Sequence, residues 1–184
     1  MGRLKAIITD FDGTLFYTLD ANYYAYKEAF DKCGIELNKD TYMKNFGLRF
    51  NEMCEKLNVP KRKRKELKEI KHAVYPKYFK HIYLNESLKR ELENNKKLGI
   101  KICIASTASK NNIYDILDYF EMKDLFDYII TGEDVKEGKP NPEVYLKALE
   151  LSDCKADEAI VYEDSEVGFQ AAENANINYI KVKL

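Results

Sequence analysis

The sequence lacks the features that would point to a membrane or a nucleic acid. No apolar run approaches the roughly 20 residues that a membrane-spanning helix needs. Neither sign of charge is in excess, because 30 basic residues stand against 31 acidic ones, for a net charge of −1. Such a balance gives no general attraction to nucleic acid or to an anionic membrane. We therefore expect neither as a partner.

One short basic segment, residues 61–65, departs locally from this balance. Glu66 and Glu69 follow it closely, and no aromatic side chain is interleaved that could stack on a base. A solvated helix face is therefore the favoured interpretation, with a nucleic-acid patch as the alternative.

Cysteine is scarce and scattered. Cys33, Cys54, Cys103 and Cys154 form no paired spacing of the kind that metal ligands show. The first five residues carry no small-residue cleavage site of a signal peptide. We therefore expect reduced thiols and a cytoplasmic location.

Hydrophobic residues make up 45% of the chain and charged residues 33%, a composition that indicates a globular, soluble protein.

Short apolar runs alternate with amphipathic stretches along much of the chain. The predicted strands are residues 4–9, 100–105, 128–130, 159–162 and 179–182. Amphipathic segments such as 86–98 and 113–120 lie between them and predict helices. Strands that alternate with helices indicate a parallel sheet covered on both faces. The fold class is therefore α/β, with a Rossmann-like three-layer core and a mostly parallel sheet.

Residues 16–83 differ from the rest, because they show helical periodicity and no convincing strand. Residues 43–57 and 61–71 each predict a helix. We interpret the whole segment as a small helical insertion after the first strand. Residues 1–15 and 84–184 then form the core domain, and a length of 184 residues suits one core with a small insertion.

Polar side chains follow the predicted strands where each strand ends. They are Asp10 and Asp12 after the first strand, Ser106 and Thr107 after the second, Lys139 within about ten residues of the third, and Glu163 and Asp164 after the fourth. In an open parallel sheet, ligands bind outside the carboxyl ends of the strands. Carboxylates favour a hard cation such as Mg²⁺, and a phosphoryl group favours a cation, a lysine and neutral donors. The collection predicts magnesium-dependent phosphoryl transfer.

The two residues Asp10 and Asp12 stand at the i, i+2 spacing, which places both side chains on one side of an extended segment. One carboxylate can then attack phosphorus while the other handles the proton of the leaving group. Gly13 permits a sharp turn after the pair, and Thr14 can donate its hydroxyl to a neighbouring carboxylate. We count Thr14 among the phosphate- or substrate-binding candidates. Alone, the pair is more typical of a turn with two solvated acids.

Each of the other motifs has a plainer interpretation as well. Ser106 and Thr107 are residue types that commonly cap a following helix, although capping and anion binding are compatible. A lone lysine such as Lys139 is usually a surface residue, but the helix start predicted at residues 141–143 places it at a helix entrance on the ligand side. Adjacent acids such as Glu163 and Asp164 repel one another unless a cation or hydrogen bonds stabilise them.

The motifs together resemble the haloacid dehalogenase superfamily, in its phosphatase and β-phosphoglucomutase-like branch. The matching segments are residues 10–15 (Asp-Phe-Asp-Gly-Thr-Leu), 104–107 (Ile-Ala-Ser-Thr), 138–142 (Gly-Lys-Pro-Asn-Pro) and 161–165 (Val-Tyr-Glu-Asp-Ser). Gly168, Ala171 and Ala172 follow the last of these, and the match covers nearly the whole chain.

The resemblance implies a role for each acid. Asp10 is expected to be the nucleophile that forms an aspartyl-phosphate. Asp12 is expected to protonate the leaving group, to activate water afterwards, and to offer its backbone carbonyl to magnesium. Asp164 is expected to bind the metal directly, and Glu163 directly or through a water.

The resemblance also implies the roles of the remaining groups. Ser106 and Thr107 are expected to bind the transferring phosphoryl group, and Lys139 to pair with both the phosphate and Asp10. The helical insertion is expected to be a cap that closes over the site and excludes water. Arg49 lies in a segment that resembles a substrate-facing cap loop, but one position away from the usual spacing, so we treat it as a substrate-binding candidate.

The expected substrate is a small phosphate monoester, such as a sugar phosphate or a nucleotide. The enzyme is expected to be a monomer or a weak dimer. A sugar phosphomutase with the same nucleophile is the alternative, and a non-catalytic protein that binds a phosphorylated ligand is a more distant one. A 2-haloacid dehalogenase is disfavoured because such relatives lack an acid at the position of Asp12. A signalling receiver domain is disfavoured because Lys139 precedes Glu163 and Asp164, whereas its lysine comes last.

Overall fold

The computed structural model describes residues 3–183 and divides into two compact units. The first comprises Met1–Tyr17 and Leu84–Leu184, and the second comprises Thr18–Tyr83. Two short strands, β2 (Phe16–Tyr17) and β3 (Tyr83–Leu84), pair where the chain leaves the first unit and returns to it.

The first unit is built on a five-stranded sheet in the order β5-β4-β1-β6-β7. Its strands are β1 (Ala6–Thr9), β4 (Lys101–Ala105), β5 (Tyr128–Ile130), β6 (Ala159–Glu163) and β7 (Asn178–Lys181). All four strand pairs are parallel, and Thr9 stands in register with Ile104 on one side and Tyr162 on the other. The predicted α/β fold with a parallel sheet is confirmed.

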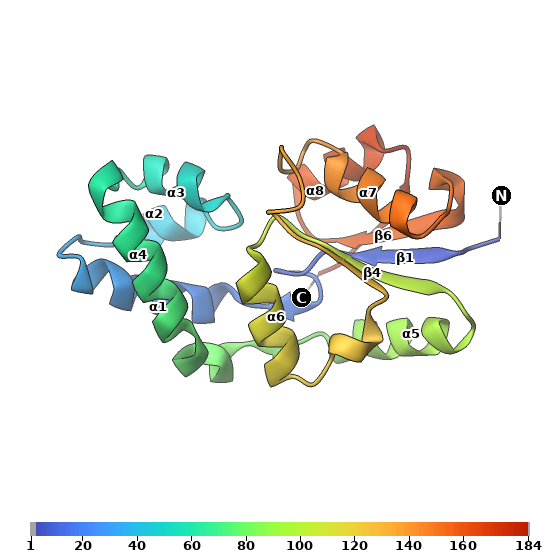
Figure 1. The fold of residues 1–184 in the computed structure, drawn as a ribbon, viewed down its shortest axis with the longest axis horizontal. Helices are drawn as coiled ribbons and strands as arrows, with labels where there is room; N and C mark the ends of the chain where they lie inside the picture. The colour runs from blue at the N-terminus through green and yellow to red at the C-terminus, as the bar shows by residue number, and fades with distance from the viewer. Residues whose placement is uncertain (1–2, 184) are drawn as a thin grey trace. The chain divides into compact units, whose positions relative to one another are not determined.

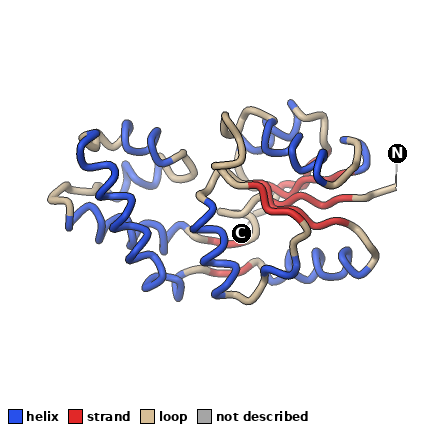
Figure 2. The backbone as a smooth tube through the Cα atoms, viewed as in Figure 1, coloured by secondary structure: helices blue, strands red, loops and turns tan. Residues whose placement is uncertain are grey.

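Helices cover both faces of this sheet. They are α5 (Glu86–Lys97), α6 (Lys110–Tyr119), α7 (Glu143–Leu151) and α8 (Glu166–Asn174), with the short 3-10 helices η2 (Lys123–Leu125) and η3 (Ala156–Glu158). Figure 1 shows α7 and α8 on one face and α5 and α6 on the other, and Figure 2 shows the strands as the layer between them. This is the three-layer arrangement predicted from the alternating pattern.

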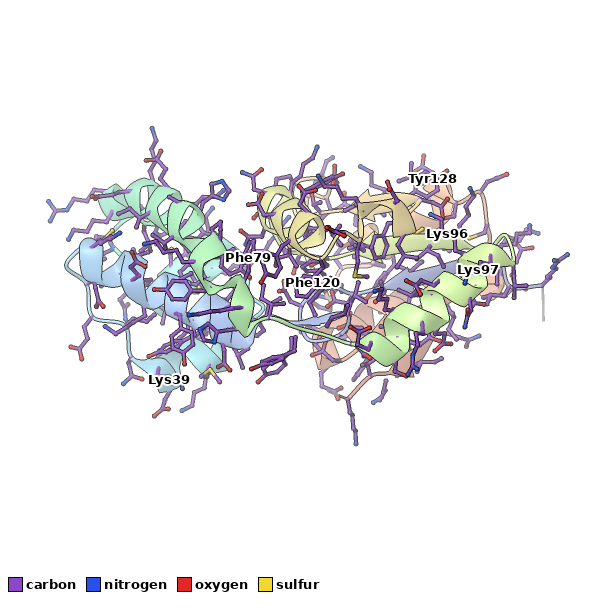
Figure 3. All side chains as sticks on the ribbon, turned by 90° about the horizontal axis from the view of Figure 1, so that it is seen from below. Lys39, Phe79, Lys96, Lys97, Phe120 and Tyr128 are labelled. Atoms are coloured by element: carbon purple, nitrogen blue, oxygen red, sulfur yellow. The ribbon has the colours of Figure 1, made fainter. Side chains whose placement is uncertain are left out.

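The strands are apolar on both faces because both faces are covered. Alternate residues of the three central strands pack with side chains of α7 and α8 in one core cluster: Ala6, Ile8, Cys103, Ala105, Ala159 and Val161. Ile7, Ile102 and Ile104 occupy intervening positions and are also buried. Phe120, labelled in Figure 3, follows α6 and packs its ring 5.0 Å from that of Phe16.

Side-chain caps fix where several of these helices begin. Asn85 accepts a hydrogen bond from the Leu88 N–H at 3.1 Å at the start of α5. Ser109 and Ser165 accept corresponding bonds at the starts of α6 and α8. Because Ser109 is the cap of α6, capping is not the role of Ser106 or Thr107 in this structure.

The second unit consists of helices around its own apolar core. They are α1 (Leu19–Lys32), α2 (Lys39–Lys44), α3 (Phe50–Lys56) and α4 (Lys61–Val74), followed by the 3-10 helix η1 (Tyr75–His81). Phe30, Tyr42, Cys54 and Leu67 are among the side chains buried in that core.

The prediction of one helix over residues 43–57 is wrong. α2 ends at Lys44 and α3 begins at Phe50, with a loop between them. Gly47 in this loop has a φ of +87°, a left-handed conformation that interrupts a right-handed helix.

The basic segment lies in the first turns of α4. Lys61, Arg62 and Lys65 are exposed, as a solvated face predicts. Lys63 donates to the carbonyl oxygen of Cys33, and Arg64 donates to that of Val59 at 3.2 Å. Part of the segment therefore holds the second unit together.

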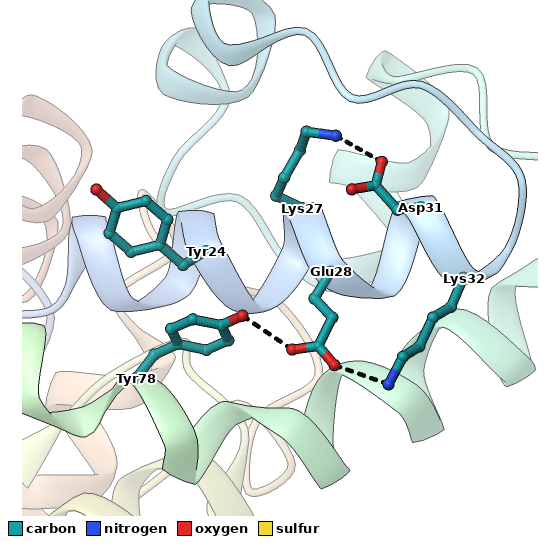
Figure 4. Close-up of a pocket in the computed structure, with 6 residues that line it drawn as sticks. All are labelled: Tyr24, Lys27, Glu28, Asp31, Lys32 and Tyr78. Atoms are coloured by element: carbon teal, nitrogen blue, oxygen red, sulfur yellow. Dashed lines mark hydrogen bonds and ion pairs between the residues drawn. The ribbon is translucent and has the colours of Figure 1, made fainter.

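A surface network joins α1 to η1 within the second unit (Figure 4). Glu28 accepts hydrogen bonds from Lys77 at 2.9 Å and Tyr78 at 2.8 Å, and forms an ion pair with Lys32 at 2.7 Å. These donors lower the pKa of Glu28 from its ordinary 4.5 to about 2. The shallow pocket drawn there contains none of the predicted site residues. Over residues 3–183, we find no helix with the length and apolarity needed to span a membrane.

Candidate active site

Asp10 lies directly beyond β1, the central strand of the sheet. Its backbone N–H donates to the carbonyl oxygen of Tyr162 at 2.9 Å, which continues the sheet pairing by one residue. The chain then turns sharply, with Gly13 at a φ of +92° and the Gly13 N–H donating to the carbonyl of Phe16 at 2.8 Å. The buried rings of Phe11 and Phe16 pack 4.9 Å apart and anchor this turn. The nucleophile candidate therefore stands on a fixed backbone.

Lys139 reaches the same place from the loop before α7. Its ammonium nitrogen lies 2.5 Å from Asp10 Oδ1 and 2.6 Å from Glu163 Oε2. The Lys139 side chain is only 5% exposed, so this is a buried ion-paired group and not a surface lysine. Asn141 helps to set the loop, because its side-chain oxygen accepts from the Glu143 N–H at 2.9 Å. α7 begins at Glu143, close to the helix start that the sequence predicts.

Glu163 ends β6, and hydrogen-bond donors hold both of its carboxylate oxygens. Oε2 accepts from Lys139 and from the hydroxyl of Tyr145 at 2.6 Å. Oε1 accepts from the Ser165 hydroxyl at 2.8 Å and from the backbone N–H groups of Ser165 and Asp164 at 3.1 and 3.2 Å. A Cβ atom on Gly168 would lie 2.0 Å from Glu163 Cδ, so glycine is required where this carboxylate rests against α8.

Asp164 faces the turn that follows Asp10. Its Oδ1 accepts the hydroxyl of Thr14 at 2.8 Å, which is the carboxylate contact anticipated for Thr14. A Cβ atom on Gly13 would lie 2.3 Å from Asp164 Oδ2. Gly13 therefore serves the site twice, since it adopts a left-handed φ and also leaves room for this carboxylate.

Ser106 and Thr107 follow β4, the neighbour of β1. Ser106 is buried, its backbone N–H donates to the Ile130 carbonyl at 3.0 Å, and its hydroxyl oxygen accepts from the Ala108 N–H at 3.0 Å. That bond uses a lone pair and leaves the hydroxyl proton to donate. A Cβ atom on Gly132 would lie 2.4 Å from the Thr107 carbonyl oxygen, so the β4 and β5 loops pack closely here.

The buried charges shift one another's pKa values. Burial and the nearby Glu163 raise the pKa of Asp10 well above its ordinary range, and Lys139 opposes that rise. Burial alone would lower the pKa of Lys139, but Asp10, Tyr145 and Glu163 outweigh it and raise that pKa, so the lysine is an ammonium. Burial tends to raise the pKa of Glu163, but Lys139 and its hydrogen bonds lower it overall. Burial also raises the pKa of Asp164.

The acids at this edge form a group that fits a divalent cation. Within residues 3–183, Asp10, Glu163 and Asp164 each place a carboxylate oxygen within 4.8 Å of the others. Closely spaced carboxylate oxygens are the donor set that Mg²⁺ prefers, and a cation there would offset their mutual repulsion. The carboxylate of Asp12 is not part of this group of described residues, although Asp12 lies in the same turn.

The structure thus brings together predicted residues from three separate segments: Asp10, Thr14, Lys139, Glu163 and Asp164. Arg49 lies in the other unit, at the start of α3. Tyr145 was not identified from the sequence. Its signal was indirect: the first turn of α7 has an apolar face, which buries a tyrosine there, and a buried hydroxyl usually requires a partner.

Comparisons with known proteins show what this chain is similar to. Residues 7–182 match the family described as haloacid dehalogenase-like hydrolase. The phosphorylated carbohydrates phosphatase of Thermotoga maritima is 28% identical over 184 residues, covering 96% of this chain and 84% of that protein. The pyrophosphatase PpaX of Bacillus cereus is 28% identical over 187 residues, covering 94% and 80%. The crystal structure of CbbY from Rhodobacter sphaeroides in complex with phosphate shares the fold, with a TM-score of 0.88, 24% identity, and coverage of 98% and 87%.

Proposed function

Because the chain belongs to the haloacid dehalogenase-like hydrolases, we propose that it is a magnesium-dependent phosphatase that hydrolyses a small phosphate monoester through an aspartyl-phosphate. Curated relatives are a phosphatase and a pyrophosphatase, which supports the predicted enzyme class, a phosphohydrolase. One observation carries the proposal: the buried Lys139 joins Asp10 to Glu163, the last residue of β6, at the carboxyl edge of the sheet.

In the first step, a carboxylate oxygen of Asp10 forms a bond to phosphorus while the bond from phosphorus to the leaving oxygen breaks. Asp12 gives its proton to that leaving oxygen. In the second step, Asp12 takes a proton from water as the water oxygen attacks phosphorus. The acyl-phosphate bond breaks, inorganic phosphate leaves, and the Asp10 carboxylate is restored.

Lys139 and the hydroxyl residues stabilise charge during both steps. Lys139 opposes the rise in the pKa of Asp10 and so favours the ionised nucleophile. Lys139 also faces the phosphoryl oxygens, and Ser106 and Thr107 donate hydrogen bonds to them. Asp10, Glu163 and Asp164, with the backbone carbonyl of Asp12, would hold a magnesium ion. When bound, the ion supplies charge neutralisation for the phosphoryl oxygens.

We propose that residues 16–83 act as the cap domain of this enzyme and supply substrate specificity. Arg49 is the residue in this segment that we assign to the substrate. Replacing Arg49 with alanine should raise the Michaelis constant for the true substrate. An unchanged Michaelis constant would remove Arg49 from the proposal.

The test is phosphate release from a panel of sugar phosphates, nucleotides, pyrophosphate and small phosphorylated acids. Release should require magnesium, stop with EDTA, and fall by about 10³-fold or more in Asp10→Asn. Asp157→Asn is the matched control, because this exposed aspartate precedes β6, at the opposite end of that strand from Glu163. It should retain full activity.

Other outcomes would favour another function. Conversion of a sugar phosphate to its isomer without phosphate release would make the chain a phosphomutase. Tight binding of a phosphorylated compound with neither reaction would favour the non-catalytic binding protein. Equal release by Asp10→Asn and wild type would exclude Asp10 as the nucleophile.

A further inference from the structure

Tyr145 is a polar side chain in the core that no motif predicts. It lies in the first turn of α7, is fully buried, and packs in the apolar cluster between α7 and the sheet. Its hydroxyl donates to Glu163 Oε2 at 2.6 Å. A phenylalanine would fill nearly the same volume, so packing alone does not require this hydroxyl.

The carboxylate oxygen that Tyr145 binds is also the oxygen that binds Lys139. Glu163 Oε2 lies 2.6 Å from both donors, and the Lys139 ammonium lies 4.9 Å from the centre of the Tyr145 ring. Tyr145 therefore contacts both members of this ion pair, one through its hydroxyl and the other through its ring face.

The position of the Glu163 carboxylate determines how the hydrogen bonds of the Lys139 ammonium are divided among its partners. An ammonium group has three N–H donors, and two of those on Lys139 point to Asp10 Oδ1 and Glu163 Oε2. One donor remains for a phosphoryl oxygen. Because the hydroxyl of Tyr145 donates to the same oxygen, the orientation of Oε2, and with it the contact between Lys139 and Glu163, depends on both donors.

We propose that Tyr145 is a positioning residue that acts through Glu163, holding this carboxylate so that Lys139 stays shared between Asp10 and the transferring phosphoryl group. The expected effect on catalysis rests on the proposed function, whereas the expected effect on the orientation of Glu163 rests on the observed contacts alone. Ser165 restrains the other oxygen of the same carboxylate, so Tyr145 and Ser165 together fix its orientation.

The kinetic test compares Tyr145→Phe with Tyr179→Phe, using the substrate that the panel identifies. Tyr179 is the matched control because its hydroxyl also donates to a carboxylate, that of Glu173 at 2.7 Å, outside the site. Tyr145→Phe should lower kcat by about 10- to 100-fold. Its KM should stay within about threefold of wild type, since the lost interaction serves the reacting group. Tyr179→Phe should change neither constant.

A double-mutant cycle separates positioning from a general structural role. If Tyr145 acts through Glu163, then Tyr145→Phe should have little further effect on kcat once Glu163→Gln is present. Losses that multiply across the two substitutions would overturn the inference, as would a Tyr145→Phe enzyme with wild-type kcat.

A second measurement does not depend on activity. In a crystal structure of Tyr145→Phe, the Glu163 carboxylate should rotate and the Lys139–Glu163 distance should depart from 2.6 Å. An unchanged contact would overturn the inference even for an active enzyme. If the wild-type protein released no phosphate from any compound, the proposed function would fail, and this structure would still decide whether Tyr145 positions Glu163.

Discussion

Gly168→Ala should destabilise the protein, although glycine-to-alanine changes in helices usually stabilise. Gly168 lies in the first turn of α8, where alanine would contribute roughly 0.5–1 kcal/mol through helix propensity. The added Cβ would, however, lie 2.0 Å from Glu163 Cδ and 2.1 Å from Oε2. The two effects have opposite signs, and the structure indicates which is larger.

The size of the effect follows from the displacement that the clash forces. Ordinary contact begins near 3.4 Å, so the carboxylate must move by about 1.4 Å from its 2.0 Å separation. Its 2.6 Å bonds to Lys139 and Tyr145 do not survive such a shift. Losing charge-assisted bonds in a buried site costs about 2–4 kcal/mol. After the helix-propensity gain is subtracted, Gly168→Ala should destabilise by about 1–3.5 kcal/mol.

Urea denaturation of four proteins tests this: wild type, Gly168→Ala, Glu163→Ala and the double variant. Glu163→Ala removes the atoms that clash, so Gly168→Ala should be neutral or slightly stabilising in that background. The coupling energy between the two positions should therefore be about 2–4 kcal/mol. If Gly168→Ala stabilised both backgrounds equally, the close packing of Glu163 against α8 would be wrong.

Three further substitutions and conditions test other parts of the structure. Lys139→Met should destabilise by about 3–5 kcal/mol in urea titrations, because it leaves the buried Asp10 and Glu163 carboxylates without their shared cation; wild-type stability would contradict this. The pKa of Glu28 is lowered to about 2, so its contribution should be present above its ordinary pKa of 4.5 and disappear as the pH falls toward 2. The difference in the free energy of unfolding between wild type and Glu28→Gln should therefore shrink as the pH falls over that range. A difference that stays constant with pH would show that the ionised Glu28 carboxylate does not stabilise the protein. Burial raises the pKa of Cys103 to about 11, so this thiol should react with iodoacetamide far more slowly in the native protein than in urea. Mass spectrometry of the peptide that contains Cys103 measures both rates. Equal rates would show that Cys103 is not buried in the core.

Much of the first unit could be predicted from the sequence because the patterns that mark its strands and helices are local. Runs of apolar residues between amphipathic segments mark the strands, and β5 spans the predicted residues 128–130. The acids follow the predicted strand ends and the lysine precedes a predicted helix start, and in a parallel sheet such groups meet at one edge. Asp10, Lys139 and Glu163 are in direct contact for that reason, across 153 positions of chain.

Other features depend on three-dimensional packing, which one sequence shows poorly. The hydroxyl of Tyr145 is needed only because Glu163 lies opposite it, and the pattern around Tyr145 is simply that of a buried helix face. The cap of α6 is Ser109, because the loop extends three residues beyond Ser106 before the helix begins. In the second unit, helical periodicity continues through Gly47, although the backbone there is left-handed.

The most direct test of the proposed chemistry is to trap the phosphoryl group on Asp10. Asp12→Ala should be incubated with magnesium and p-nitrophenyl phosphate, whose leaving group needs no added proton, so that the first step proceeds while attack by water is slowed. The protein should then be quenched in acid and digested, and its peptides analysed by mass spectrometry. We expect one phosphoryl group on the peptide that contains Asp10, and none in the Asp10→Asn, Asp12→Ala double variant. Nitrophenol release with no phosphoryl group on Asp10, or with one on another residue, would contradict the aspartyl-phosphate mechanism.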